Sequence, residues 1–263
     1  MSGFLLEEMQ IPHMRYGPED IRLEPTPKRV RAFAAGELVV DSNRAQIMFE
    51  AGYLPVVYVP KDDVRMELLK PQASDRPAGR KGPATVWAVV SESRTVEEAL
   101  FSYEESPDGC PDLSELIGMY WARMDTIFEE EEEVFGHARD PYHRVEVLRS
   151  SKHVRVLVGD VTLAETNRPM MLLETNLPVR YYIPKLDVRF DRLTPSDHTS
   201  MCPYKGKATQ YWSVPDGKKN VCWSYPFPRL ECSLIANHVA FYSELVDVYV
   251  DGVRQDSRDS PFA

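Results

Sequence analysis

The stretch Cys202-Pro203-Tyr204-Lys205-Gly206-Lys207-Ala208-Thr209 gathers a thiol, a phenol and two ammonium groups around one glycine. It continues directly into Gln210-Tyr211-Trp212-Ser213-Val214, whose aromatic and β-branched residues favour a strand. Because glycine lacks a Cβ, the backbone at Lys205-Gly206 can approach a ligand closely. The stretch therefore predicts a strand that begins beside a candidate site.

A shorter form of this stretch occurs earlier in the chain, as part of a long internal repeat. A shift of 124 positions aligns residues 30–85 with 154–209 without a gap, and 17 of the 56 aligned pairs are identical. The identical pairs include Asn43-Arg44 with Asn167-Arg168, Glu50 with Glu174, Tyr58 with Tyr182, Asp63 with Asp187, Arg65 with Arg189, and Lys81-Gly82 with Lys205-Gly206. The period far exceeds that of a solenoid, so each copy is predicted to be a domain with its own core.

The repeat sets the expected domain organisation. Four prolines stand among charged residues in the first 27 positions, which favours an extended arm there. The predicted parts are an arm at 1–27, a diverged first repeat domain at 28–139, a connector at 140–151 and a second repeat domain with the full motif at 152–263. Val145, Val147 and Leu148 of the connector also fit an edge strand.

Apolar alternation and turn residues predict mainly β structure in both copies, with minor α. The expected pairs are a hairpin of residues 154–158 with 161–164, a pair of 208–214 with 220–225 across Pro215-Asp216-Gly217, and a final hairpin of 239–242 with 246–250. Arg180–Pro184 reads as a short aromatic strand, whereas 187–193 fits either a strand or a helical turn. In the first copy, residues 113–124 have helical spacing.

Charge and composition exclude several classes of protein. The chain of 263 residues has a formal net charge of −10, which opposes a nucleic-acid partner. Its four cysteines are too few and scattered for a disulfide scaffold, which favours a reducing compartment. No apolar run is long enough for a membrane span, and Met1–Glu8 lacks the basic start of a secretory signal. These features predict a soluble, cytoplasmic protein without a membrane partner.

Several motifs of the second copy resemble a known family. They are Cys202-Pro203-Tyr204-Lys205-Gly206 and Trp223-Ser224-Tyr225-Pro226, accompanied by Asn167-Arg168, Glu174, Tyr182-Ile183-Pro184, Asp187-Val188, Tyr211-Trp212-Ser213-Val214, Val239-Ala240-Phe241-Tyr242 and Val246-Asp247. On these residues the chain resembles a tandem form of the domain of unknown function family numbered 427. The resemblance implies two homologous β-rich domains, each an open barrel or a pair of small antiparallel sheets.

That family is sometimes catalogued with a nucleotidyltransferase label. Nucleotidyl transfer needs carboxylates that hold Mg²⁺ beside a phosphate cradle. The sequence contains no glycine-rich phosphate loop and no spaced aspartate pair of that kind. The resemblance therefore bears on the fold more than on the reaction.

Cys202 and Lys205 are the candidate catalytic residues. Lys205 could hold a phosphate or carboxylate as a point charge, or it could be a turn lysine whose stem covers aromatic surface. Cys202 could be a nucleophile if a nearby cation lowers its pKa, whereas most free cysteines are buried small hydrophobes. Because Lys81-Gly82 repeats the pair without the cysteine, a turn required by the fold is an equal alternative.

The aromatic residues of the second copy exceed what a small core needs, and some of them are expected to line a ligand pocket. The predicted ligand-binding residues are Tyr182, Arg189, Tyr204, Trp212, Trp223 and Tyr225. Arg168, Glu174 and Asp187 fit either a structural ion-pair network or the wall of the same pocket. No metal site is predicted, since the histidines and cysteines lack zinc-type spacing, and no cofactor is specified.

Three functions are compatible with these residues. The first is binding of a small anionic or polar metabolite in the second domain, with catalysis left open because no acid–base pair can be assigned. The second is a non-catalytic protein-interaction module that presents the acidic segment Glu129–Glu133 and exposed strand edges. The third is a redox or acyl-transfer enzyme that uses Cys202.

Overall fold

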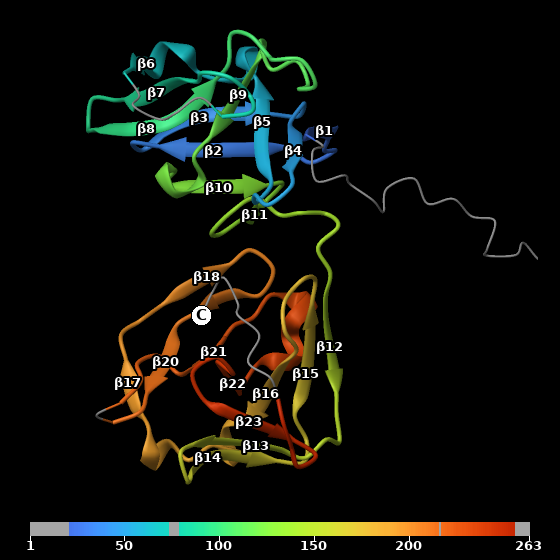
Figure 1. The fold of residues 1–263 in the computed structure, drawn as a ribbon. Helices are drawn as coiled ribbons and strands as arrows, with labels where there is room; N and C mark the ends of the chain where they lie inside the picture. Colours follow the sequence, from blue (N-terminus) through green and yellow to red (C-terminus); the bar gives the residue numbers. More distant parts are fainter. Residues whose placement is uncertain (1–20, 74–78, 216, 256–263) are drawn as a thin grey trace, which may run out of the picture. The chain divides into compact units, whose positions relative to one another are not determined.

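The computed structural model describes residues 21–73, 79–215 and 217–255. The chain divides into two compact units, residues 1–138 and 139–263 (Figure 1). Most of the predicted N-terminal arm, together with Ala78 and the turn residue Asp216, lies outside the described residues.

The first unit contains two antiparallel sheets. The larger sheet consists, in spatial order, of β1 (Ile21–Pro25), β4 (Gln46–Glu50), β5 (Val56–Pro60), β9 (Leu116–Met119), β8 (Thr95–Ser102), β7 (Thr85–Val90) and β6 (Leu69–Gln72). The smaller sheet consists of β11 (Glu132–Glu133), β10 (Thr126–Glu129), β2 (Val30–Ala34) and β3 (Glu37–Ser42). Strands β2 and β10 run across the direction of β5 and β9 (Figure 1).

The second unit repeats this arrangement. Its larger sheet consists of β12 (Val145–Arg149), β15 (Met170–Glu174), β16 (Arg180–Pro184), β22 (His238–Phe241), β21 (Cys222–Ser224), β20 (Gln210–Ser213) and β17 (Thr194–Ser196). Its smaller sheet consists of β14 (Val161–Thr166), β13 (Val154–Val158), β23 (Asp247–Val250) and β24 (Val253–Arg254), and a third sheet pairs β18 (Ser200–Cys202) with β19 (Gly206–Ala208).

The larger and smaller sheets of the two units share one topology, and the pair of β18 with β19 is added in the second unit. Strand β12 stands in the second larger sheet where β1 stands in the first, and the correspondence continues in order to β17 and β6. None of the described sheets closes into a barrel, and every described strand pairing is antiparallel. The expected mainly β fold with two tandem domains is therefore confirmed, in its form with separate antiparallel sheets.

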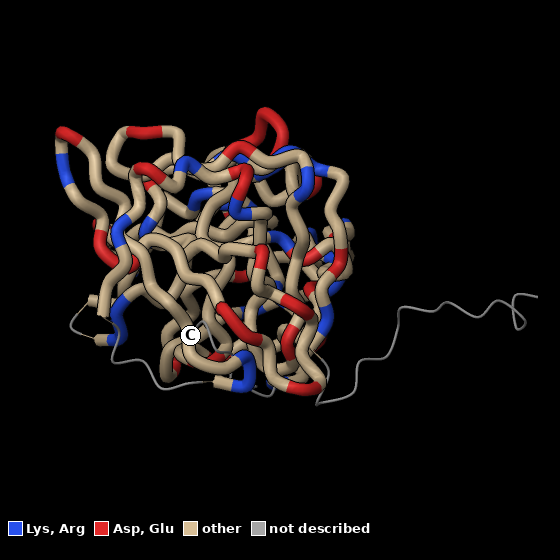
Figure 2. The backbone as a smooth tube through the Cα atoms, turned by 90° about the horizontal axis from the view of Figure 1, so that it is seen from above, with Lys and Arg blue, Asp and Glu red and all other residues tan. Residues whose placement is uncertain are grey.

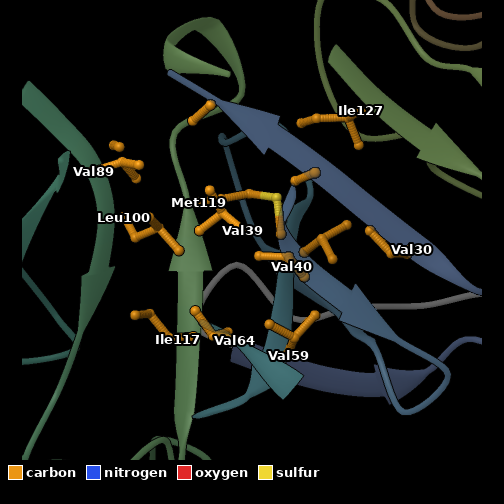
Figure 3. Close-up of a cluster of buried hydrophobic side chains, with 14 of the residues drawn as sticks. Val30, Val39, Val40, Val59, Val64, Val89, Leu100, Ile117, Met119 and Ile127 are labelled. Atoms are coloured by element: carbon orange, nitrogen blue, oxygen red, sulfur yellow. The ribbon is translucent and has the colours of Figure 1, made fainter. Parts of the chain in front are cut away.

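Each unit buries its main core between the two sheets. In the first unit Val30 and Val40 of the smaller sheet meet Val59, Leu100 and Met119 of the larger one (Figure 3). Because side chains alternate along a strand, Tyr58 points to the opposite face, where it joins a second buried cluster. The larger sheet is thus buried on both faces, which explains the continuous apolar run of β5.

The second unit has the same two layers of apolar contacts. Ile183 packs in the core between the sheets, and its neighbour Tyr182 packs on the opposite face. That second face is covered partly by η7 (Leu230–Ile235), whose Cys232 and Ile235 are fully buried. The larger sheet therefore carries an aromatic cluster on its far face in both units.

In each unit, an aspartate at the equivalent position binds an arginine and a hydroxyl group. Asp63 accepts hydrogen bonds from Ser42 (2.7 Å) and Arg44 (2.5 Å), and Asp187 accepts them from Thr166 (2.7 Å) and Arg168 (3.3 Å). Both aspartates end short 3₁₀ turns. Those two turns are η2 (Lys61–Asp63) and η5 (Lys185–Asp187), and each is followed by a second short 3₁₀ turn, η3 (Met66–Leu68) or η6 (Phe190–Arg192). The segment 187–193 thus contains 3₁₀ turn at Asp187 and at Phe190–Arg192, with Val188 in a single β-bridge to Ala164 between them. The repeated residues Arg44, Asp63, Arg168 and Asp187 have a structural role.

Two expected strand pairs of the second copy are confirmed. Strands β13 and β14 form the hairpin around Gly159, and β20 pairs with β21. The final hairpin is wrong, because β22 pairs with β16 and β21 in the larger sheet while β23 pairs with β13 and β24 in the smaller one. The short connection lets the chain cross between sheets that share one core.

The helix expected at residues 113–124 is also wrong. This segment contains β9 and the short 3₁₀ turn η4 (Trp121–Arg123). All four residues of β9 are buried, since the strand is covered on both faces. Apolar residues at every position remove the period of two that marks a half-exposed strand.

In Figure 2 the blue Lys and Arg segments and the red Asp and Glu segments both occur at many places along the tube. No helix within the described residues is long and apolar enough to cross a membrane.

Candidate functional site

A buried ion pair lies at the centre of the second unit's conspicuous motif. The Lys205 ammonium donates to Glu174 at the end of β15, with 2.5 Å between Nζ and Oε2. The other carboxylate oxygen is 3.1 Å from Nε2 of His143. The side chains of Glu174 and Lys205 are only 7% and 10% exposed. The carboxylate therefore joins β15, the Lys205 turn and the segment before β12.

Electrostatics favours the ionised form of Glu174. Burial by itself would raise the pKa of this carboxyl group. The hydrogen bond with His143 and the charge of Lys205 outweigh that effect and hold the pKa below its ordinary value.

Tyr204 contacts two of the first residues of the second unit, Asp140 and His143. Its ring stacks on the His143 imidazole with 4.2 Å between centroids, and its hydroxyl accepts a hydrogen bond of 2.8 Å from the backbone N–H of Asp140. Burial raises the pKa of Tyr204 to about 12. Arg139 donates from Nε to the carbonyl oxygen of Pro203 at 3.0 Å. We call Arg139, His143, Glu174, Tyr204 and Lys205 the Lys205 corner.

Gly206 gives the turn its shape. Its φ is +105°, and a Cβ there would lie 3.3 Å from the carbonyl oxygen of Phe227. The backbone N–H of Arg229 donates to the carbonyl of Lys205 at 3.0 Å. The close approach that the glycine permits is therefore to the chain's own backbone.

Three of the predicted aromatic residues lie together in one buried cluster. Tyr182, Trp223 and Tyr225 belong to the cluster on the far face of the larger sheet. Trp223 meets Tyr182 edge-on at 6.3 Å between ring centroids, and burial raises the pKa values of Tyr182 and Tyr225 well above the ordinary range. Cys202 is half-buried and packs against the same cluster.

Two predicted residues lie elsewhere. Arg189 is exposed and binds Asp191 through two hydrogen bonds of 2.9 Å. Trp212 packs in the core between the sheets, with its ring 5.0 Å from that of Phe190. Strand alternation places Trp212 on the face opposite to its neighbour Tyr211, which joins the aromatic cluster.

The first unit holds the same ion pair. Lys81 binds Glu50, with side chains 19% and 9% exposed, at positions 124 residues before Lys205 and Glu174. The pair therefore belongs to the fold of each unit, whereas the contacts of His143 and Tyr204 extend it in the second. Sequence reasoning overlooked Arg139 and His143. Arg139 is the last residue of the predicted first domain, His143 falls in the predicted connector, and nothing in their spacing links them to Lys205.

The acidic segment proposed for protein interaction is largely engaged within the first unit. Glu129 is buried and binds Lys28 at 2.5 Å. Glu130 accepts from the backbone N–H of Arg29, and Glu131 binds Arg31 at 3.0 Å. No group of three His, Cys, Asp or Glu side chains within the described ranges is placed to hold a metal ion.

The fold and this corner define a class of protein with two tandem β domains, each holding a buried Lys–Glu pair at the same place. The chain belongs to the domain of unknown function family DUF427, whose sequence model matches residues 22–130 and again residues 146–252. The resemblance drawn from the motifs is thereby confirmed. The chain matches none of the curated proteins with which it was compared.

Proposed function

We propose that the second unit binds a small anionic or polar molecule at the Lys205 corner. One observation carries the proposal. Nη2 of Arg139 is buried and has no hydrogen-bond partner among the described residues. A buried guanidinium nitrogen without a partner costs free energy, and an oxygen of a carboxylate or phosphate would supply the missing bond.

The residues of the corner take different roles in this proposal. Arg139 and His143 provide the polar contacts to the ligand. Lys205 is already bound to Glu174, so it positions that carboxylate and, through it, the imidazole. The buried aromatic cluster has a structural role in this proposal; it contains Tyr182, Trp223 and Tyr225, and Cys202 packs against it. Arg189 and Trp212 have no part in the proposed site.

Thermal unfolding with inorganic phosphate, acetate and citrate tests the proposal. A ligand that binds the folded protein raises the melting temperature by an amount that grows with its concentration. We expect at least one anion to do so, and Arg139→Gln to remove the shift. The matched control is Arg189→Gln, which removes the same charge from an exposed site of the same unit. Equal shifts for both variants and the natural protein would contradict the proposal.

A second candidate function uses the Cys202 thiol. Cys222 and Cys232 are fully buried, and burial raises the pKa of Cys232 to about 11, so neither suits a nucleophile at neutral pH. Cys202 is half-buried, as is Cys110 of the first unit. If Cys202 is chemically activated, iodoacetamide should label it faster than Cys110 at pH 7. Labelling at the same rate would show accessibility without activation.

A further inference from the structure

A cleft of about 320 Å³ lies in the second unit, away from the Lys205 corner. Residues of both sheets line its apolar walls, and three polar residues line the rest. The apolar lining includes Val154, Val156, Phe241 and Val248, and the polar lining is Arg180, Ser243 and Gln255. This volume is at the lower end of the range of small-molecule sites.

The first unit fills the corresponding place with its own side chain. Tyr120 and Tyr242 occupy equivalent positions, because their backbone N–H groups donate to Ala99 (3.0 Å) and Val221 (2.9 Å) at the same point of the matching strands. The next residue is Trp121 in the first unit and Ser243 in the second. The indole of Trp121 packs against the core between the sheets.

The hydrogen bond of the Trp121 indole shows which residue of the second unit lies across the cleft from Ser243. Nε1 of Trp121 donates to the carbonyl oxygen of Val134 at 3.2 Å. Val134 corresponds to Gln255, since their N–H groups donate to Ile127 (2.9 Å) and Val248 (2.8 Å), equivalent residues of β10 and β23. In the first unit, the indole of Trp121 therefore fills the space between the positions that correspond to Ser243 and Gln255. In the second unit, that space is the cleft.

The polar end of the cleft carries balanced charge. Arg180 donates to Glu244 and to the Ser243 hydroxyl at 2.8 Å, and the two charged side chains are 11% and 9% exposed. The guanidinium also lies 5.6 Å from the ring centroid of Tyr242. Because this cation is already neutralised, the cleft offers apolar walls and hydrogen-bonding groups without a free charge.

We infer that this cleft binds an uncharged planar aromatic molecule with an N–H donor, of the size of indole, in the place that Trp121 fills in the first unit. The aromatic ring replaces the missing side chain between the valine walls. Its N–H points toward Gln255, as the Trp121 Nε1–H points toward Val134. The site is distinct from the Lys205 corner, so Arg139→Gln is expected to leave it unchanged.

Isothermal titration calorimetry of the full chain with indole tests the inference. We expect one site per chain in the natural protein. Ser243→Trp places an indole in the cleft from the protein itself and should weaken binding by at least about tenfold. A natural protein that does not bind indole would overturn the inference, as would Ser243→Trp binding it unchanged.

The reciprocal change in the first unit provides a second measurement. Trp121→Ser removes the indole from a folded unit and should add a second indole site, since cavities lined by apolar residues take up aromatic molecules of matching shape. The stoichiometry should rise from one to two. If Ser243→Trp does not fold, a stoichiometry that stays at one in Trp121→Ser would itself overturn the assignment of the cleft.

Discussion

At the scale of single residues, the buried Lys–Glu pair is the feature on which both units agree. Lys81 with Glu50 and Lys205 with Glu174 occupy equivalent places, and all four side chains are largely shielded from water. An ion pair in such a place contributes little net stability when intact, but the loss of one partner leaves a buried charge without compensation.

We therefore expect Lys81→Ala and Lys205→Ala to lower the free energy of unfolding by similar amounts, about 3–5 kcal/mol each. Urea denaturation of the two variants measures this effect. Exposed Lys152→Ala serves as the control and should change stability by less than about 1 kcal/mol. A large loss for Lys205→Ala alone would mean that the pair is not a common requirement of the fold.

The protonation of Glu174 links stability to pH. Its pKa in the folded protein lies below the ordinary value of 4.5, so its ionised form contributes stability above that value and the contribution is lost as the pH falls through the folded pKa. The stability difference between the natural protein and Glu174→Gln should be constant near neutral pH and shrink below about pH 4.5. Urea titrations from pH 3 to 7 measure it, and a difference that grows in acid would contradict the assignment.

At the scale of strands, each aromatic cluster places a large side chain opposite a small residue on the neighbouring strand. Phe101 of β8 lies opposite Gly118 of β9, and Trp223 of β21 lies opposite Ala240 of β22. A Cβ added at Gly118 would lie 2.5 Å from Cζ of Phe101. The Phe101 ring also packs edge-on against Tyr58, at 5.7 Å between centroids, so it has little room to move.

Gly118→Ala should therefore destabilise the first unit by about 1–3 kcal/mol, the usual cost of overpacking a core. Thermal or urea unfolding measures the change. In Gly118→Ala combined with Phe101→Leu, the loss should be smaller than the sum of the single losses, because the contact that causes the clash is gone. Additive losses would show that the glycine is needed for another reason.

Strand pairing was predictable only where a turn fixes it. The hairpin of β13 and β14 follows from the Gly159 turn, whose φ is +58°. The partners of β22 and β23 could not be read in this way, since apolar periodicity shows which side is buried and not which sheet receives the strand. The prediction of a helix over β9 has a different cause, since a strand buried on both faces lacks the period of two that marks a half-exposed strand.

At the scale of the whole molecule, each unit has a complete set of sheets and its own cores. The second unit begins at Arg139 and includes β12, whereas the sequence places residues 140–151 in a connector. Strand β12 pairs with β15, and its Val145 and Val147 pack against the aromatic cluster. These contacts tie the edge strand to the second unit.

We expect a fragment of residues 139–263 to unfold cooperatively by itself. A fragment of 152–263 should be less stable by about 3 kcal/mol or more, because it loses two partly buried valines and the backbone pairing of β15. Circular dichroism during urea denaturation compares the two. Equal stability would show that β12 is dispensable and that the boundary belongs where the sequence alone places it.

The sequence by itself determined the β class, the duplication and the family, because these depend on residue patterns and on identities at a fixed spacing. It also marked Glu174 and Lys205 as positions that are identical in the two copies. Only the tertiary structure decided that these two side chains touch, that Arg139 and His143 join them and that Arg189 and Trp212 do not. It alone relates Ser243 to the cleft, because long-range contacts depend on the order of strands in a sheet and on the volume of side chains across it.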